Sequence, residues 1–187
     1  MVVTRGGALA LRPALDAVRT AARARRHPLV LIDGPSGSGK TTFAAALVEA
    51  WPGRPPAVVR VDEAIPGWHG LRRGAEALGP RLVTPRQSGR IGVLRRWDWH
   101  ASRWNGLAHL RPGAPLIIEG CGAFLAGEPA PGAIRVWLTA PDDTRRVRAL
   151  ARDDGGFDDF WDAWESDWRR YLGRSGERAS DAIRVRI

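Results

Sequence analysis

The stretch LVLIDGPSGSGKTT, residues 29–42, decides the fold of this chain. It begins within an apolar run over residues 28–33 that is typical of a short buried strand. Residues 34–41 match the pattern G-x-x-x-x-G-K-[ST] in full, and residues 42–50 are rich in helix formers. Strand, glycine-rich loop and helix in this order predict a phosphate-binding loop, because the loop N–H groups and the helix N-terminus both favour an anion.

The lysine of this loop has no counterpart elsewhere in the chain. Lys40 is the only lysine among 29 basic residues; all the others are arginines. Lysine carries a compact ammonium on a flexible stem, whereas the planar fork of arginine is too bulky for a loop wrapped around phosphates. Lys40 is therefore predicted to reach the β- and γ-phosphates of ATP, and the Thr41 hydroxyl to hold Mg²⁺. The predicted nucleotide-binding residues of the loop are Gly34, Pro35, Ser36, Gly37, Ser38, Gly39, Lys40, Thr41 and Thr42.

The composition is that of one globular domain. The chain has 187 residues, of which 44% are hydrophobic, and no apolar run approaches the ~18 residues of a membrane span. Its one cysteine, Cys121, excludes an internal disulfide and fits a reducing cytoplasm. The net charge of +9 raises the question of a nucleic-acid partner, but the arginines are spread along the chain, so the sequence does not favour one.

The order of predicted elements indicates an α/β chain. Strands alternating with helices predict a three-layer P-loop NTPase fold, with a parallel sheet of about five strands flanked by helices. Ligands bind at the carboxyl ends of such strands, so we expect the phosphate-binding loop, Asp62 and Glu119 to meet at one edge. The strands are expected over 28–33, 57–61, 115–120, 134–138 and 182–187, and the helices over 8–26, 42–50, 97–110, 141–153 and 158–172. Residues 64–96 are expected to be irregular, apart from a short helix over 71–78.

Residues 32–42 resemble the corresponding loop of the uridine kinase and phosphoribulokinase group of P-loop kinases, and four further segments agree in order. They are Val61-Asp62, Trp97-Asp98-Trp99 with Arg103 after it, residues 117–120 (IIEG) and residues 143–153 (DTRRVRALARD). The resemblance covers residues 29–153. It implies one kinase domain over residues 1–187, with a leading helix over 1–27, an acceptor-binding insertion over 64–110, and lid and C-terminal helices over 141–173.

The resemblance also implies roles for the matching residues. Asp62 would accept the proton of the acceptor hydroxyl, and Glu119 would position a Mg²⁺ water or bind the substrate. Basic residues of the 143–153 helix would neutralise phosphate charge as a lid; a solvated basic helix face is the alternative reading. The implied residues are Lys40, Asp62, Arg145 and Arg148 for catalysis, Arg152 for the nucleotide, Trp97, Asp98, Arg103, Asp62 and Glu119 for the substrate, and Thr41 and Glu119 for the metal.

The chain departs from this family where the acceptor would bind. The aromatic-Asp-His-Pro segment that usually follows the second strand is replaced by residues 65–70 (IPGWHG). The predicted function is therefore ATP-dependent phosphorylation of a hydroxyl on a small nucleoside-like metabolite. The alternatives are a nucleoside monophosphate kinase, in which Arg72, Arg73, Arg95 and Arg96 would clamp the extra phosphate, a nucleotide-binding ATPase or switch, and a polynucleotide-binding protein.

Overall fold

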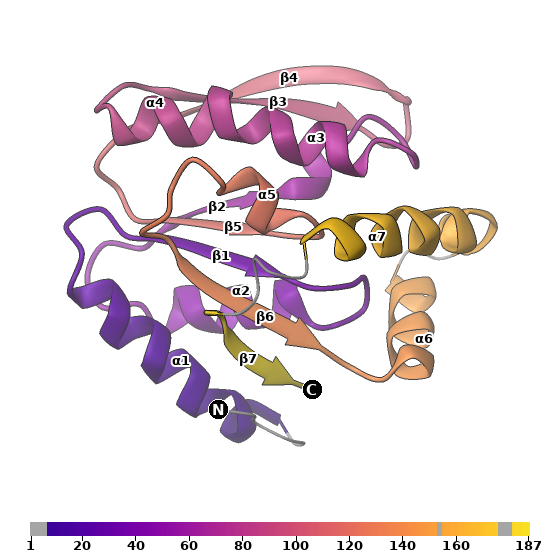
Figure 1. Cartoon of the computed structure of the whole chain (residues 1–187), viewed down its shortest axis with the longest axis horizontal. Helices are drawn as coiled ribbons and strands as arrows, with labels where there is room; N and C mark the ends of the chain where they lie inside the picture. The colour runs from indigo at the N-terminus through magenta and orange to yellow at the C-terminus, as the bar shows by residue number, and fades with distance from the viewer. Residues whose placement is uncertain (1–6, 153–154, 176–180) are drawn as a thin grey trace.

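The structure is a computed structural model and describes residues 7–152, 155–175 and 181–187. Its centre is a parallel five-stranded sheet with the strand order β2-β5-β1-β6-β7 (Figure 1). Because β1 lies in the middle of a parallel sheet, the loop that follows it opens at the same edge as the loops after β2 and β5. The strands are β1 (Leu29–Asp33), β2 (Ala57–Arg60), β5 (Leu116–Glu119), β6 (Ile134–Thr139) and β7 (Ile183–Arg186).

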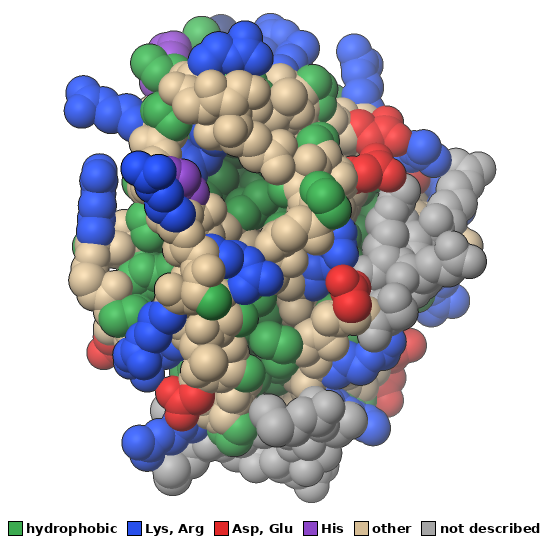
Figure 2. Space-filling view, turned by 60° about the vertical axis from the view of Figure 1, so that its left-hand side comes forward, with side chains coloured by type: hydrophobic (Ala, Val, Ile, Leu, Met, Phe, Trp, Pro, Cys, Tyr) green, Lys and Arg blue, Asp and Glu red, His purple; other side chains and the backbone are tan. Residues whose placement is uncertain are grey.

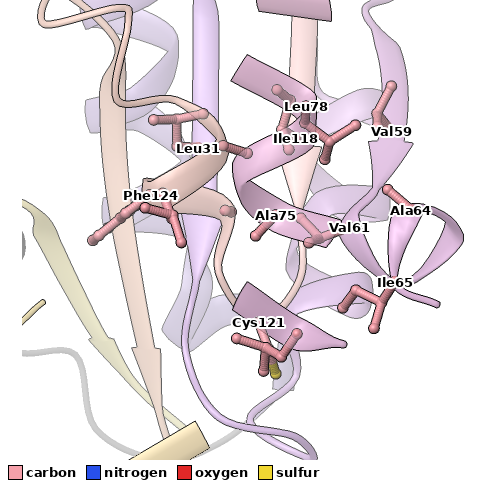
Figure 3. Close-up of a cluster of buried hydrophobic side chains, with 14 of the residues drawn as sticks. Leu31, Val59, Val61, Ala64, Ile65, Ala75, Leu78, Ile118, Cys121 and Phe124 are labelled. Carbon is pink, nitrogen blue, oxygen red and sulfur yellow. The ribbon is translucent and has the colours of Figure 1, made fainter. Parts of the chain in front are cut away.

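Helices cover both faces of the sheet, so the molecule has three layers. Along β1, Val30 and Ile32 pack against α1 and α2, whereas Leu31 packs in the second core, on the opposite face (Figures 1 and 3). This alternation follows from the two-residue period of a strand. The predicted α/β fold class is confirmed. The helices of the two faces and of the carboxyl edge are α1 (Gly7–Arg23), α2 (Lys40–Glu49), α3 (Leu71–Leu78), α5 (Ala123–Ala126), α6 (Asp142–Arg152) and α7 (Trp161–Ser175).

The segment after β2 is more regular than the sequence predicts. The short helix over residues 71–78 is confirmed as α3, but it continues through a π-helical turn, Gly79–Val83, into α4 (Thr84–Gln87). A 3-10 turn, Val61–Ala64, precedes it. Residues 71–87 are therefore continuously helical and residues 92–96 belong to a strand, so the expectation of an irregular stretch was wrong.

The predicted helix over residues 97–110 is also wrong, because these residues form part of a β-hairpin. Strands β3 (Gly92–Asp98) and β4 (Arg103–Leu110) pair antiparallel above α3 and α4 (Figure 1). Leu94 and its partner Ala108 face the core, but a register shift between Arg95 and Trp97 interrupts the alternation. A bulge of this kind hides the two-residue period that would otherwise predict a strand.

The last helix, α7, carries three tryptophans at helical spacing. Trp161, Trp164 and Trp168 recur at i, i+3 and i+7, and all three are buried in the core. A single 3-10 turn, Asp158–Phe160, leads into the helix. Among the helices that the structure describes, none is long and apolar enough to cross a membrane.

Candidate nucleotide and acceptor site

The phosphate-binding loop turns at three glycines with positive φ. Gly34, Gly37 and Gly39 have φ of 146°, 76° and 87°, a region that only glycine enters at low cost. A methyl group on Gly37 would overlap the carbonyl oxygen of Arg145, so glycine also allows α6 to approach the loop closely. The loop ends at Gly39, from which α2 begins.

Asp33 fixes the base of this loop from below. Its carboxylate accepts hydrogen bonds from the backbone N–H groups of Gly34, Gly122 and Phe124, at 2.7, 3.0 and 2.9 Å, and from the Tyr171 hydroxyl at 2.6 Å. Complete burial raises the pKa of Asp33, although these hydrogen bonds oppose the shift. The carboxylate thus braces the P-loop against α5 and α7.

Lys40 is the first residue of α2, and its side chain turns back onto the loop that it is predicted to serve. Its Nζ donates to the carbonyl oxygen of Pro35 at 2.7 Å and lies 3.7 Å from the sulfur of Cys121. The thiol itself donates to the carbonyl of Gly34 at 3.4 Å, and burial raises the pKa of Cys121. Cys121 is therefore a buried neutral thiol packed under the loop, in line with the structural role that its position suggests.

A carboxylate and a hydroxyl meet at the start of α2. The Thr41 hydroxyl donates to Oε1 of Glu119 at 3.1 Å, and the guanidinium of Arg60 lies 3.8 Å from the same oxygen. Only 3% of Glu119 is exposed, and this burial raises the pKa of its carboxyl. The nearby charge of Asp62 raises it further, whereas Lys40 lowers it. Asp62 and Lys40 are thus both close enough to Glu119 to shift the pKa of its carboxyl.

These groups fit ATP and Mg²⁺ by their chemistry. Oxygen ligands suit Mg²⁺, which usually takes one or two protein oxygens and completes its shell with water and phosphate oxygens. Thr41 and Glu119 offer such a pair, and the described residues contain no cluster of three acidic, His or Cys side chains that could hold a metal alone. In the described loop, the N–H groups of Gly37, Gly39 and Lys40 donate to no protein acceptor, so they are available to phosphate oxygens.

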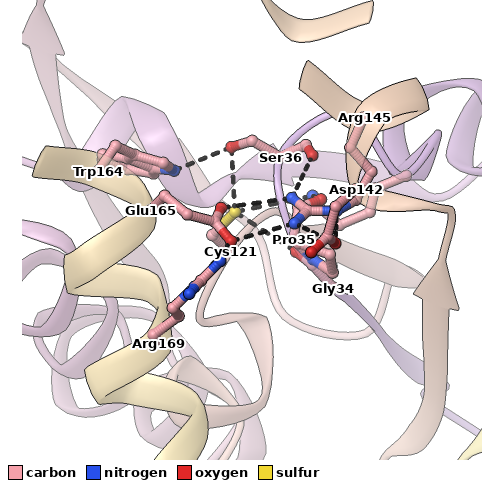
Figure 4. A network of polar contacts seen from close by, with 10 residues as sticks. Gly34, Pro35, Ser36, Cys121, Asp142, Arg145, Trp164, Glu165 and Arg169 are labelled. Atoms are coloured by element: carbon pink, nitrogen blue, oxygen red, sulfur yellow. Dashed lines mark hydrogen bonds and ion pairs between the residues drawn. The ribbon is translucent and has the colours of Figure 1, made fainter. Parts of the chain in front are cut away.

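Arg145 supports the loop rather than extending from it. Its side chain donates to the carbonyl oxygen of Ser36 at 3.1 Å, to Asp142 at 2.8 Å and to Glu165 at 3.1 Å (Figure 4). Burial alone would lower the pKa of Arg145, but the hydrogen bonds to Glu165 and Asp142 outweigh it, and the net shift is upward. The guanidinium is a permanent cation that joins α6 and α7 to the P-loop.

The other two arginines of α6 lie in a different environment. Arg148 and Arg152 are exposed, whereas only 3% of Arg145 is exposed. The exposure of the three side chains differs because Arg145 turns inward to meet Ser36 and Glu165. Arg148 and Arg152 retain the exposure that a phosphate-covering lid requires.

The hairpin places its three predicted acceptor residues at its tip. Trp97 packs edge-to-face on Trp104 at 5.3 Å between ring centroids. Asp98 pairs with Arg103 across the two strands, and its carboxylate accepts the N–H of Ala101 at 2.9 Å. This hydrogen bond is the main cause of the lowered pKa of Asp98. Asp98 therefore caps the hairpin turn.

Trp99, the last residue of the Trp97-Asp98-Trp99 segment, contacts the Asp62 segment, and the sequence does not predict its partners there. The indole N–H of Trp99 donates to the backbone carbonyl of Asp62 at 3.1 Å, while the Asp62 side chain is exposed. Trp68 lies 4.7 Å from Trp99 between ring centroids and stacks on Phe160 at 4.6 Å. Trp164 of α7 completes the group at 6.2 Å from Trp68. No local pattern unites these residues, because they come from four separate segments.

Charged side chains are distributed over the surface as the sequence suggests. On the face drawn in Figure 2, Lys and Arg side chains are dispersed and do not form one continuous stripe. Acidic side chains are fewer on the same face. The dispersion follows the even spread of arginine along the chain.

No protein-family model and no curated protein match the chain. Solved structures do. A possible uridine kinase from Bacillus stearothermophilus superposes with a TM-score of 0.64 at 20% identity, over 94% of this chain and 98% of that one. A protein described as a fructose transport system kinase, from Silicibacter sp. TM1040, superposes with a TM-score of 0.52 at 17% identity, over 92% and 98%.

These similarities show which fold the chain has. The central sheet, the loop after β1 and the extensive superposition show that the chain has the fold of the P-loop kinases. Within that class, the chain has the fold of the uridine kinase-like proteins. The phosphate-binding loop and the four further matching segments indicate the same group from the sequence.

Proposed function

We propose that this protein is an ATP-dependent kinase that transfers the γ-phosphoryl group to a hydroxyl of a small nucleoside-like metabolite. The observation that carries the proposal is the juxtaposition of three groups at one sheet edge. Lys40 belongs to the phosphate-binding loop, Glu119 is hydrogen-bonded to Thr41 at the start of α2, and Asp62 lies close enough to raise the pKa of Glu119. The proposed phosphate site, metal-binding pair and base thus belong to the same edge of the sheet.

Each group of residues would have a separate role in phosphoryl transfer. The loop N–H groups and the Nζ of Lys40 would bind and orient the phosphates of ATP. Thr41 and Glu119 would hold Mg²⁺, which when bound neutralises charge on the phosphate oxygens. An Asp62 carboxylate oxygen would accept the proton of the attacking hydroxyl. Arg148 would supply further positive charge from the lid, with Arg152 beside the nucleotide.

An acceptor with a flat ring suits the surroundings of Asp62. Trp99 contacts the Asp62 segment directly, and Trp68 packs against Trp99. Aromatic walls favour planar or apolar ligands, which offset-stack on their faces. Trp97, Asp98 and Arg103 remain proposed pocket residues on the hairpin tip, where they would close the acceptor site from above.

A nucleoside monophosphate acceptor is less well supported than a nucleoside. Such an acceptor needs arginines that are available to clamp its phosphate. Arg72 is paired with Glu76 at 2.7 Å and Arg96 with Glu63 at 2.9 Å. Two of the four arginines that this alternative requires are therefore already engaged within the protein.

The test is ADP release from Mg-ATP with a panel of nucleosides, nucleoside monophosphates and small hydroxylated metabolites. We expect release that depends on a nucleoside-like acceptor and falls at least about a hundred-fold in Asp62→Asn, the size expected for loss of a general base. Asp16→Asn is the matched control, because Asp16 is an exposed carboxylate on α1. Full activity of Asp62→Asn would overturn the base assignment. ATP hydrolysis that no acceptor stimulates would favour the ATPase alternative.

A further inference from the structure

Two tryptophans connect the halves of the proposed site. The indole N–H of Trp164, on α7, donates to the Ser36 hydroxyl of the P-loop at 2.9 Å (Figure 4). The indole N–H of Trp99, in the hairpin turn, donates to the carbonyl oxygen of Asp62 at 3.1 Å. The two rings meet edge-to-face, with centroids 6.4 Å apart. A line of contacts therefore runs from the P-loop to the candidate base.

Burial gives the Trp164 hydrogen bond its importance. Only 5% of Trp164 is exposed, and an indole N–H that is removed from water loses free energy unless it finds an acceptor. The Ser36 hydroxyl is that acceptor, and it also lies 3.6 Å from the sulfur of Cys121. The hydroxyl of this loop residue is thus held in one place from two sides.

The contacts to Ser36 leave the backbone N–H groups of the loop unused. Trp164 binds the hydroxyl of Ser36, and Arg145 binds its carbonyl oxygen. Neither contact uses a backbone N–H of the loop, and these are the groups that bind phosphate. The arrangement can therefore hold the loop in its phosphate-binding shape without competing with the nucleotide.

Packing around the two tryptophans makes the link stiff. Trp68 touches both of them, with centroid distances of 4.7 Å to Trp99 and 6.2 Å to Trp164. Trp68 is in turn stacked on Phe157 and Phe160, with interplanar angles of 15° and 6°. Displacement of one ring would disturb the others, because close-packed aromatic groups have few alternative arrangements.

We infer that Trp164 and Trp99 are positioning residues: Trp164 fixes the P-loop through Ser36, Trp99 fixes the segment that carries Asp62, and their ring contact couples nucleotide binding to acceptor binding. The Trp99 part rests on the proposed kinase function. The Trp164 part concerns nucleotide affinity alone, so it can be measured without any acceptor.

The first experiment measures the Kd of Mg-ADP by calorimetry for Trp164→Phe, Ser36→Ala and the double variant. Loss of one buried hydrogen bond should weaken binding about five-fold in each single variant. The Kd of the double variant should not exceed the higher of the two single-variant Kd values, because both changes remove the same interaction. Trp51→Phe is the control: Trp51 packs against the other core beyond the C-terminal end of α2, at the opposite end of that helix from the loop. We expect its Kd to stay at the wild-type value.

Three results would overturn the Trp164 role. They are an unchanged Kd in Trp164→Phe, an equal loss in Trp51→Phe, and losses that add in the double variant. Thermal denaturation shows whether each variant is folded at the assay temperature. If Trp164→Phe does not fold, Ser36→Ala decides the matter, since an unchanged Kd in that variant contradicts the role.

The second experiment measures turnover with the acceptor that the panel identifies. Trp99→Phe should lower kcat/KM for the acceptor several-fold while raising the Kd of Mg-ADP less than Trp164→Phe does, because it frees the Asp62 carbonyl but keeps the hydrogen bond from Trp164 to Ser36. The coupling predicts that Mg-ADP raises acceptor affinity in the wild type and does so less in Trp164→Phe. Equal enhancement in the two proteins would refute the coupling. If no acceptor is found, the kinase proposal fails, while the Mg-ADP result still judges the role of Trp164.

Discussion

The phosphate-binding loop and the β3–β4 hairpin are built in opposite ways. The loop lies between β1 and α2, and three glycines with positive φ shape it within a few residues of sequence. The hairpin takes its place through distant contacts, such as Trp99 with Asp62 and Arg96 with Glu63. The geometry of the proposed phosphate site therefore depends on residues that are close together in sequence. The geometry of the proposed acceptor side depends on packing between distant segments.

The largest effect should come from the loop. Lys40→Ala should lower kcat/KM about a hundred- to a thousand-fold, because no other lysine can supply a compact cation to the phosphates. Steady-state kinetics with the identified acceptor measure this loss. The control is Arg54→Ala, which removes an exposed basic residue beyond α2 and should leave the kinetics unchanged. Near-wild-type activity of Lys40→Ala would show that the loop does not act on the phosphates.

A pair of glycines compares the two regions directly. Gly37 in the loop and Gly106 in β4 both have positive φ, 76° and 91°. An added methyl group would meet the Arg145 carbonyl at Gly37 but open space at Gly106. Gly37→Ala should therefore lower the free energy of unfolding by more than about 2 kcal/mol, and Gly106→Ala by about 1 kcal/mol. Denaturant unfolding of both variants checks this order; equal losses would show that α6 does not confine the loop.

The smallest effect concerns the pH dependence of stability. Burial raises the pKa of Glu119 in the folded protein above its ordinary value of 4.5, so the charged carboxylate opposes folding at neutral pH. As the pH falls through the raised value towards 4.5, Glu119 takes up a proton and this cost is relieved. Glu119→Gln should be at least as stable as the wild type at pH 7, with the difference shrinking in acid. Thermal unfolding at several pH values measures the stability difference between Glu119→Gln and the wild type. A variant whose stability relative to the wild type is lower at pH 7 than at pH 5 would contradict the predicted direction.

The sequence predicts the parts of the fold whose pattern is local. The five strands of the main sheet, the loop and α3 follow from apolar runs, glycines and helix formers in short windows. The hairpin escapes such a prediction because the register shift between Arg95 and Trp97 breaks its two-residue period. A helical reading of residues 97–110 is the consequence.

The candidate site shows the same division. The motif places Lys40 and Thr41 in the loop, and the strand ends bring Glu119 and Asp62 to the same edge. Burial separates Arg145 from its neighbours on α6, and no spacing rule reports that, because its partner Glu165 lies on another helix. The pairing of Trp164 with Ser36 likewise depends on how α7 crosses the loop.

The central claim is that a phosphoryl group passes from ATP to a hydroxyl held beside Asp62. Its most direct test is mass spectrometry of a mixed nucleoside pool after incubation with the protein and Mg-ATP labelled with ¹⁸O in the γ-phosphoryl group. We predict that one class of nucleoside gains a single labelled phosphoryl group in step with ADP, and that Asp62→Asn abolishes this product. Labelled inorganic phosphate without any phosphorylated nucleoside, or an undiminished product in Asp62→Asn, would contradict the account.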